Sequence, residues 1–219
     1  MKKLIRGILE FRKTRRPDYA ETFARLALGQ SPDSLFVACS DSRVVPNLFA
    51  SSEPGDLFVL RNVGNIISPC GPGGVSRSDE SEAAAFEFSI LGLKVTDLIV
   101  CGHSSCGAMR ALLDEKAGID APHFKAWLRH AGPSLARLGA GERMNAELPI
   151  HDHLSQINVL QQIEHLRSYP IVRESEQAGR IRLHAWWFDI AHAEVLAYRP
   201  AERRFAAIDE TNDGRVPTP

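Results

Sequence analysis

Three residues with metal-binding side chains follow or end the apolar runs of the sequence. Cys39 ends an apolar run, and His103 and Cys106 follow a second apolar run. His103 and Cys106 are three residues apart, which lets them face one point on the first turn of a helix. If the two apolar runs are neighbouring strands, two thiolates and an imidazole meet at one place. Three such ligands with a fourth position open are typical of catalytic rather than structural zinc.

Asp41 and Arg43 follow Cys39 at a spacing of two residues. In an extended chain the three side chains share one face, because side chains alternate with period two. An ionised carboxylate only accepts hydrogen bonds, so Asp41 is predicted to accept one from solvent at the metal. Arg43 is predicted to hold Asp41 off the metal by a charge-assisted contact. A plain surface ion pair is the alternative, but it contributes little and does not need this spacing.

The remaining cysteines and the histidines near Asp152 have simpler explanations. Cys101 lies within an apolar run, which indicates a buried, unreactive thiol. Cys70 lies in a loop rich in Pro and Gly, with no ligand neighbour at metal spacing. His151 and His153 flank Asp152 near the start of a predicted helix, where local hydrogen bonding accounts for them.

The composition describes an ordinary globular protein. The chain has 219 residues, and 26 basic against 27 acidic residues give a formal charge of −1. This balance gives no argument for a nucleic-acid or anionic-membrane partner. No apolar run reaches transmembrane length, and the basic start lacks the apolar core of a signal peptide. Four cysteines without an export signal indicate reduced thiols, so we expect a cytoplasmic enzyme.

The elements that must position these residues alternate between strands and helices. Strands are predicted at 34–39, 56–61 and 97–101, and helices at 44–50, 78–93, 108–114, 123–131 and 150–166. Further strands are predicted at 180–190, 194–198 and 206–208. This order predicts an α/β fold, with a central parallel β-sheet, flanking helices and an antiparallel C-terminal extension.

The periodicity also predicts how two helical regions are used. Residues 152–166 carry apolar side chains at three-residue steps, which predicts an amphipathic helix with one buried stripe. Amphipathic helices are predicted at 4–11 and 19–28, with Pro17 between them. We therefore expect an N-terminal helical arm over residues 1–30. Residues 31–219 are expected to form a single α/β zinc-enzyme domain.

Three short stretches together resemble the β-class carbonic anhydrases. They are Cys-Ser-Asp-Ser-Arg at 39–43, Arg-Asn-Val-Gly-Asn at 61–65 and Gly-His-Ser-Ser-Cys-Gly at 102–107, and the similarity runs over 19–198. The resemblance implies reversible hydration of CO2 to bicarbonate and a proton by zinc-bound hydroxide, with one Zn2+ per chain. It also implies a homodimer or a higher homo-oligomer.

The resemblance assigns roles by position. Cys39, His103 and Cys106 match the zinc ligands, and Asp41 with Arg43 matches the catalytic pair.

The resemblance extends to a substrate pocket. Gln30 matches the substrate-binding glutamine of the plant-like subgroup, and Phe58 and Phe88 match its apolar pocket. Apolar Phe58, Val63 and Phe88 suit CO2, and Gln30 can donate to a developing bicarbonate oxygen. Ordinary core packing is an equal alternative for each phenylalanine.

Two further features concern the subgroup and one turn. Phe36 stands where the allosteric subgroup has a tryptophan, so we expect an open, water-bound site. The whole layout resembles the bacterial carbonic anhydrases encoded with cyanate degradation.

The turn at 189–194 has Ala where the family has Gly at a position of positive φ. This difference predicts another turn shape and leaves the C-terminal strand pairing open.

Other functions compete with this interpretation. One is a hydrolase of CS2 or COS on the same scaffold. Another is a structural or regulatory zinc protein without turnover, against which the Asp41–Arg43 pair argues. A deaminase is disfavoured, because no H-x-E with P-C-x-x-C is present.

Overall fold

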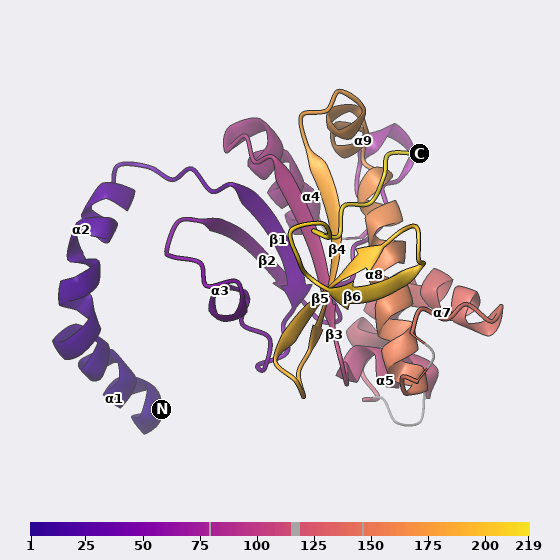
Figure 1. Cartoon of the computed structure of the whole chain (residues 1–219), viewed down its shortest axis with the longest axis horizontal. Helices are drawn as coiled ribbons and strands as arrows, with labels where there is room; N and C mark the ends of the chain where they lie inside the picture. The colour runs from indigo at the N-terminus through magenta and orange to yellow at the C-terminus, as the bar shows by residue number, and fades with distance from the viewer. Residues whose placement is uncertain (79, 115–118, 146) are drawn as a thin grey trace.

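One mixed β-sheet forms the centre of the molecule (Figure 1). The computed structural model describes residues 1–78, 80–114, 119–145 and 147–219. Within these residues six strands pair in the order β2-β1-β3-β4-β5-β6. The strands are β1 (Ser34–Cys39), β2 (Leu57–Asn62), β3 (Asp97–His103), β4 (Arg182–Asp189), β5 (Glu194–Arg199) and β6 (Arg204–Ala207).

The sheet is parallel at its core and antiparallel at its C-terminal edge. β1 pairs in parallel with both β2 and β3, and β3 pairs in parallel with β4. β5 is antiparallel to β4 and to β6. The predicted α/β fold with an antiparallel extension is thereby confirmed. From β1 the chain moves to β2 on one side and then crosses to β3 on the other, so the strand order reverses at β1 and β3.

Helices cover the sheet unequally. They are α1 (Lys2–Glu10), α2 (Arg16–Leu26), α3 (Pro46–Phe49), α4 (Glu80–Glu87), α5 (Gly107–Leu113), α6 (Pro122–Leu128), α7 (Gly132–Gly139), α8 (Ile150–Arg167) and α9 (Pro170–Gln177). Shorter helical turns are η1 (Phe11–Arg15), η2 (Pro72–Gly74), η3 (Phe88–Gly92) and η4 (Arg129–Ala131). Helix α8 packs along β3 and β4 (Figure 1). In the part of the chain that is described, no helix is both long and apolar enough to span a membrane.

Two apolar clusters lie on opposite faces of the sheet. Leu35 and Val37 of β1 join the large core, while Phe36 and Ala38 join a smaller cluster. This alternation is what an extended strand buried on both faces requires. The predicted strand at 34–39 matches β1 at both ends.

Helix α8 differs from its prediction. It was expected to bury one apolar stripe, but most of its residues are buried, including polar ones on the opposite side. The helix packs between the sheet and other helices, so it has little solvent-facing surface. The buried polar groups are tolerated because they bond to loop backbone. Gln162 accepts the Ile67 N–H at 2.8 Å, and Asn158 donates to the Gly64 carbonyl at 3.2 Å.

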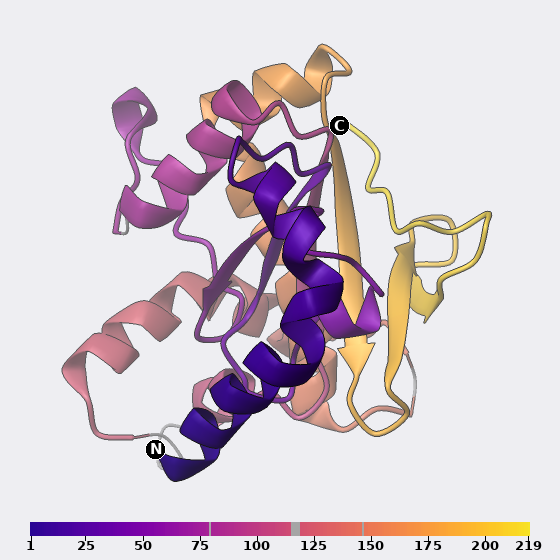
Figure 2. The same cartoon turned by 90° about the vertical axis from the view of Figure 1, so that its left-hand side faces the viewer.

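The N-terminal helices lie to one side of the sheet (Figures 1 and 2). Helix α1, the π-helical turn η1 and α2 follow one another without a break, and none of their residues is buried. Pro17 does not separate two helices as the sequence predicts. It lies in the first turn of α2, directly after the π-helical turn η1, and the helical backbone continues through it.

The turn between β4 and β5 contains the alanine of positive φ. Asp189 pairs with Glu194, so the strand pairing that the sequence left open does form. Ala193 adopts the left-handed conformation, with φ 53°. Local contacts hold it there, because the Ile190 N–H donates to Ser104 Oγ at 2.9 Å and the Ala191 N–H donates to Asp189 Oδ1 at 3.0 Å.

We therefore expect Ala193→Gly to raise the free energy of unfolding by about 1 kcal/mol, because it relieves the left-handed strain of an L-residue. Thermal or urea unfolding at one fixed protein concentration measures this change. Ala191→Gly is the control, because Ala191 is not among the residues of positive φ. Equal changes for the two variants would contradict the assigned strain.

Candidate metal centre

The candidate ligands lie at the carboxyl ends of two adjacent parallel strands. Cys39 is the last residue of β1, and His103 is the last residue of β3. Ala38 pairs with Cys101, so the two chain ends leave the sheet side by side. In open α/β sheets this crevice, where the strand order reverses, is the usual place for a ligand.

Cys106 reaches the same point from the start of α5. It occupies the N-cap position of that helix, and Ser104 and Ser105 connect it to the end of β3. The prediction that His103 and Cys106 share one helical turn is therefore wrong. Instead, Ser105 takes a left-handed conformation with φ 57°, and this sharp turn brings the two side chains together.

The three ligand atoms form one buried cluster. The sulfurs of Cys39 and Cys106 and a ring nitrogen of His103 all lie within 4.8 Å of one another. All three residues are buried. Cys101 lies in the smaller cluster on the other face of the sheet, where burial raises the pKa of its thiol. Its predicted role as an unreactive core residue agrees with this environment.

The imidazole of His103 is oriented as a metal ligand requires. Its Nδ1 lies 2.9 Å from the Ser104 carbonyl, which can only accept, so Nδ1 carries the hydrogen. Nε2 is buried and has no hydrogen-bond partner within the described residues. A buried nitrogen left without a partner is costly, and a bound cation would satisfy it.

The charge state of the two thiols also favours a cation. A hydrogen bond from Cys106 lowers the pKa of Cys39 most, with His103 and the Asp41 N–H contributing. The same pairing raises the pKa of Cys106, because a second thiolate would lie beside the first. A soft divalent cation would balance both negative charges, so this donor set fits zinc.

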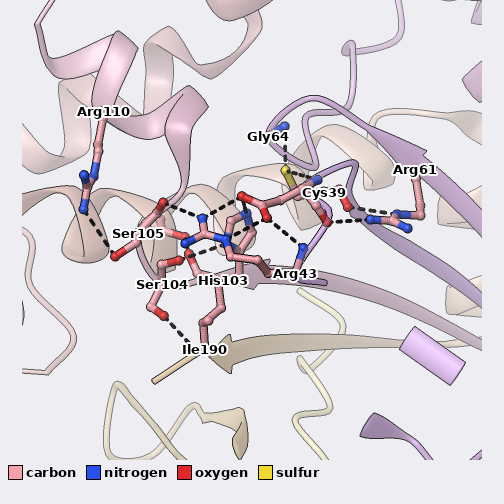
Figure 3. A network of polar contacts seen from close by, with 12 residues as sticks. Cys39, Arg43, Arg61, Gly64, His103, Ser104, Ser105, Arg110 and Ile190 are labelled. Carbon is pink, nitrogen blue, oxygen red and sulfur yellow. Dashed lines mark hydrogen bonds and ion pairs between the residues drawn. The ribbon is translucent and has the colours of Figure 1, made fainter. Parts of the chain in front are cut away.

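Asp41 is held by Arg43 through three hydrogen bonds. Arg43 Nε and Nη2 donate to the two carboxylate oxygens at 2.9 and 2.7 Å, and the Arg43 N–H donates to Oδ1 at 3.0 Å (Figure 3). The side-chain hydrogen bond from Arg43 holds the pKa of Asp41 well below its usual range. Asp41 Oδ2 lies 4.0 Å from His103 Nε2, so the carboxylate borders the cluster.

The local geometry of this pair was predicted incorrectly. Asp41 and Arg43 do not continue the strand, because the chain turns and the Val44 N–H donates to the Asp41 carbonyl at 3.0 Å. The turn itself brings the Arg43 amide and guanidinium to one carboxylate. The expected contact therefore forms by a different route.

Arg61 is a contributor to which the sequence assigned no role. From β2 it donates to the carbonyls of Cys39 and Asp41 at 3.0 and 2.7 Å (Figure 3). It thereby fixes the backbone on both sides of Ser40. The available signal was a basic residue at the end of the strand predicted at 56–61.

The loop after β2 supports Cys39 from the other side. The Gly64 N–H donates to Cys39 Sγ at 3.3 Å. Gly64 has φ +82°, and a Cβ there would lie 2.8 Å from the Cβ of Ala108, so both conformation and space require glycine. Trp127 Nε1 donates to the Val63 carbonyl at 2.8 Å and holds the same loop.

A cavity of about 420 Å³ opens beside Cys39. It is lined by Cys39, Ser40, Asp41, Val63, Gly107, Ala108, Ala111, Ile119 and Phe124. Of the predicted pocket residues, Val63 is present. Phe124 and Ile119 were not anticipated, since neither lies near a recognised stretch.

The other three predicted pocket residues lie outside this cavity. Phe58 and Phe88 pack against each other with ring centroids 5.8 Å apart, and Phe88 is half exposed. Gln30 is exposed in the segment between α2 and β1.

Comparison with known proteins decides the family. The family model described as "Carbonic anhydrase" matches residues 34–195. A carbonic anhydrase from Pseudomonas aeruginosa is 40% identical over 218 residues, which cover 99% of this chain and 96% of that protein. Carbonic anhydrase 1 from Escherichia coli O157:H7 is 40% identical over 95% of this chain and 92% of that one.

Solved structures agree with the sequence matches. The β-carbonic anhydrase CcaA is 35% identical with a TM-score of 0.88, covering 98% of this chain and 94% of that one. The chain belongs to the β-class carbonic anhydrases.

Membership in this family gives the three-ligand cluster its function. The chain is a carbonic anhydrase, an enzyme that acts on CO2 and bicarbonate, with a Cys-His-Cys site of the kind that holds metal in this class. It is therefore an enzyme rather than the structural or regulatory protein that the sequence left as an alternative.

We expect Cys39→Ser to weaken zinc binding by at least about 100-fold, because a serine hydroxyl does not supply the thiolate of a soft-metal site. Metal content after gel filtration and competition with a chromogenic chelator measure the loss. Cys101→Ala is the matched control, since Cys101 is equally buried but lies on the other face of the sheet. Full metal content in Cys39→Ser would remove Cys39 from the ligand set.

Proposed function

We propose that this carbonic anhydrase hydrates CO2 reversibly with one zinc ion per chain, held by Cys39, His103 and Cys106. The observation that carries the proposal is the buried Nε2 of His103, which lies beside two thiols and has no hydrogen-bond partner in the part of the chain that the structure describes. When bound, zinc would supply Lewis-acid chemistry that lowers the pKa of a water molecule far below its value in bulk water.

Asp41 and Arg43 are proposed as the catalytic pair. Both oxygens of Asp41 accept from Arg43, so the carboxylate is held as a hydrogen-bond acceptor and not as a further metal ligand. It can then accept a hydrogen bond from a proton-bearing group in the cavity and orient the attacking oxygen toward CO2. Arg43 provides the alignment, since a guanidinium matches a carboxylate in two places.

The apolar wall of the cavity is proposed to receive CO2. Val63 and Phe124 line the cavity beside Asp41. A small neutral molecule with little polarity is accommodated there without loss of hydrogen bonds.

Gln30, Phe58 and Phe88 are proposed to contact substrate in an oligomer. None of them lines the cavity of its own chain, so a second copy would have to supply them. The half-exposed ring of Phe88 supports this assignment.

A homodimer or higher homo-oligomer is proposed to form through the arm, residues 1–30, which we treat as separate from the domain 31–219. The support is an exposed apolar surface on α1, formed by Leu4, Ile5, Ile8 and Leu9 at 50–65% exposure. Two related β-carbonic anhydrases of Sordaria macrospora, one of them 27% identical with a TM-score of 0.76 and covering 89% of this chain and 94% of its own, are described as tetrameric.

The finer classification and the compartment are also proposals. We propose that the chain belongs to the plant-like subgroup and to the type encoded with cyanate degradation. The support is Phe36 in place of tryptophan and the hydrogen bonding of Asp41 to Arg43. A cytoplasmic location is supported by the four cysteines, which are all free.

We expect Arg43→Ala to keep its zinc and to lose about 100-fold in kcat for CO2 hydration, because Asp41 loses its alignment. Stopped-flow hydration with metal analysis measures both quantities. Arg182→Ala is the matched control, since Arg182 pairs with Asp97 and is 46% exposed, against 48% for Arg43. Wild-type kcat in Arg43→Ala would contradict the catalytic pair.

We expect the double substitution Ile5→Glu and Ile8→Glu to reduce the oligomer, because charges on an apolar contact surface oppose its burial. Sedimentation velocity measures the change in mass, with Lys2→Glu as the control for added negative charge. An unchanged mass would show that the arm does not mediate assembly.

A further inference from the structure

Ser105 joins the metal cluster to the catalytic pair. It lies between His103 and Cys106, in the left-handed conformation with φ 57°. A non-glycine residue keeps this conformation only where its surroundings hold it. The groups that hold Ser105 therefore also fix how the two proposed ligands approach each other.

Each polar group of Ser105 has a partner. Its N–H donates to Asp152 Oδ1 at 2.6 Å, and its carbonyl accepts from Arg43 Nη2 at 3.3 Å. Its Oγ accepts from Arg110 Nη2, also at 3.3 Å (Figure 3). Ser105 thus connects Asp152, through its N–H, to Arg43, through its carbonyl.

Asp152 is placed to hold the peptide group between Ser104 and Ser105 firmly. It belongs to the first turn of α8, an 18-residue helix, and is 5% exposed. The amide dipoles of the first turn favour a carboxylate there. The sequence explained the two flanking histidines by local hydrogen bonding and assigned no role to Asp152. In the structure His151 Nε2 lies 3.5 Å from Asp152 Oδ1, while the Ser105 nitrogen lies closer, at 2.6 Å.

We propose that Asp152 is a positioning residue for CO2 hydration. By accepting the Ser105 N–H, it holds Ser105 in its left-handed conformation, so that the Ser105 carbonyl in the next peptide group faces Arg43. Arg43 then stays aligned with Asp41. Asp152 does not line the cavity beside Cys39, so it acts through these two residues. The inference rests on the proposed roles of Arg43 and Asp41.

Three substitutions of Asp152 separate positioning from charge. Asp152→Asn keeps an acceptor oxygen in place without the charge, whereas Asp152→Glu keeps the charge and displaces the oxygen. Asp152→Ala removes both. We expect Asp152→Asn to keep most of its kcat. We expect kcat to fall about tenfold in Asp152→Ala and Asp152→Glu, with zinc content and KM little changed. If Asp152→Glu kept its kcat while Asp152→Asn lost it, the proposal would be overturned, because the charge of Asp152 and not the position of its oxygen would then support hydration.

A double-mutant cycle tests the route through Arg43. In the Arg43→Ala background we expect Asp152→Ala to lower kcat less than about twofold further, because the aligned group is already absent. A full tenfold additional loss would overturn the proposed connection.

Amide hydrogen exchange of the metal-free protein provides a measurement that does not depend on activity. We expect the Ser105 amide to exchange at least about tenfold faster in Asp152→Ala and to stay protected in Asp152→Asn. Glu176→Gln is the control, since Glu176 pairs with Arg167 at the other end of α8 and should change stability alone.

These outcomes distinguish the inference about Asp152 from the proposed function on which it rests. Unchanged Ser105 exchange in Asp152→Ala overturns the inference even if wild-type hydration is rapid. Absence of hydration by the zinc-loaded wild type overturns the proposed function, whatever the exchange shows.

Discussion

The parallel pairing of β1 with β3 is the constraint on which the site depends. It places the carboxyl ends of two buried strands next to each other, so Cys39 and His103 leave the sheet at one edge. Both strands are apolar and covered on both faces, which fixes their register. Because the strand order reverses at this pair, a crevice opens where the chain diverges, and the remaining ligand enters from the next helix.

The cluster itself is unfavourable without a cation. Two thiols and an imidazole are buried together, and ionising Cys39 makes ionisation of Cys106 harder. The protein stabilises this arrangement with backbone donors, including the Gly64 N–H to Cys39 Sγ, and by turning His103 Nδ1 toward a carbonyl. These contacts leave one nitrogen and two sulfurs directed at the same point, which is how a site is prepared for metal before metal arrives.

Helix α8 connects the two halves of the site from behind the sheet. Ser155 Oγ donates to the His103 carbonyl at 2.8 Å, and Asn158 donates to the Gly64 carbonyl at 3.2 Å. Gly102 allows the helix to approach, because a Cβ there would lie 2.6 Å from Val159 Cγ2. The buried polar residues of α8, which lie outside its predicted apolar stripe, thus fix the positions of β3 and of the loop after β2 relative to each other.

The sequence determined the parts of the site that depend on short spacings. It predicted β1 at both ends and the ligand set Cys39, His103 and Cys106 as neighbours, because strand order brings these residues together. It also predicted the contact between Asp41 and Arg43, two residues apart, although a turn and not strand alternation forms that contact. It also placed the C-terminal strands, but it left their pairing open because of the alanine in the turn at 189–194.

Only the tertiary structure decided which distant groups meet. The turn at Ser105, the contacts of Arg61, and the cavity wall at Phe124 depend on neighbours that no local pattern identifies. The same holds for α8, whose polar face is buried because loop carbonyls and amides are available to it, not because of its own periodicity. Burial is a property of the assembled fold, so a sequence pattern predicts which residues prefer the interior but not which partners they find there.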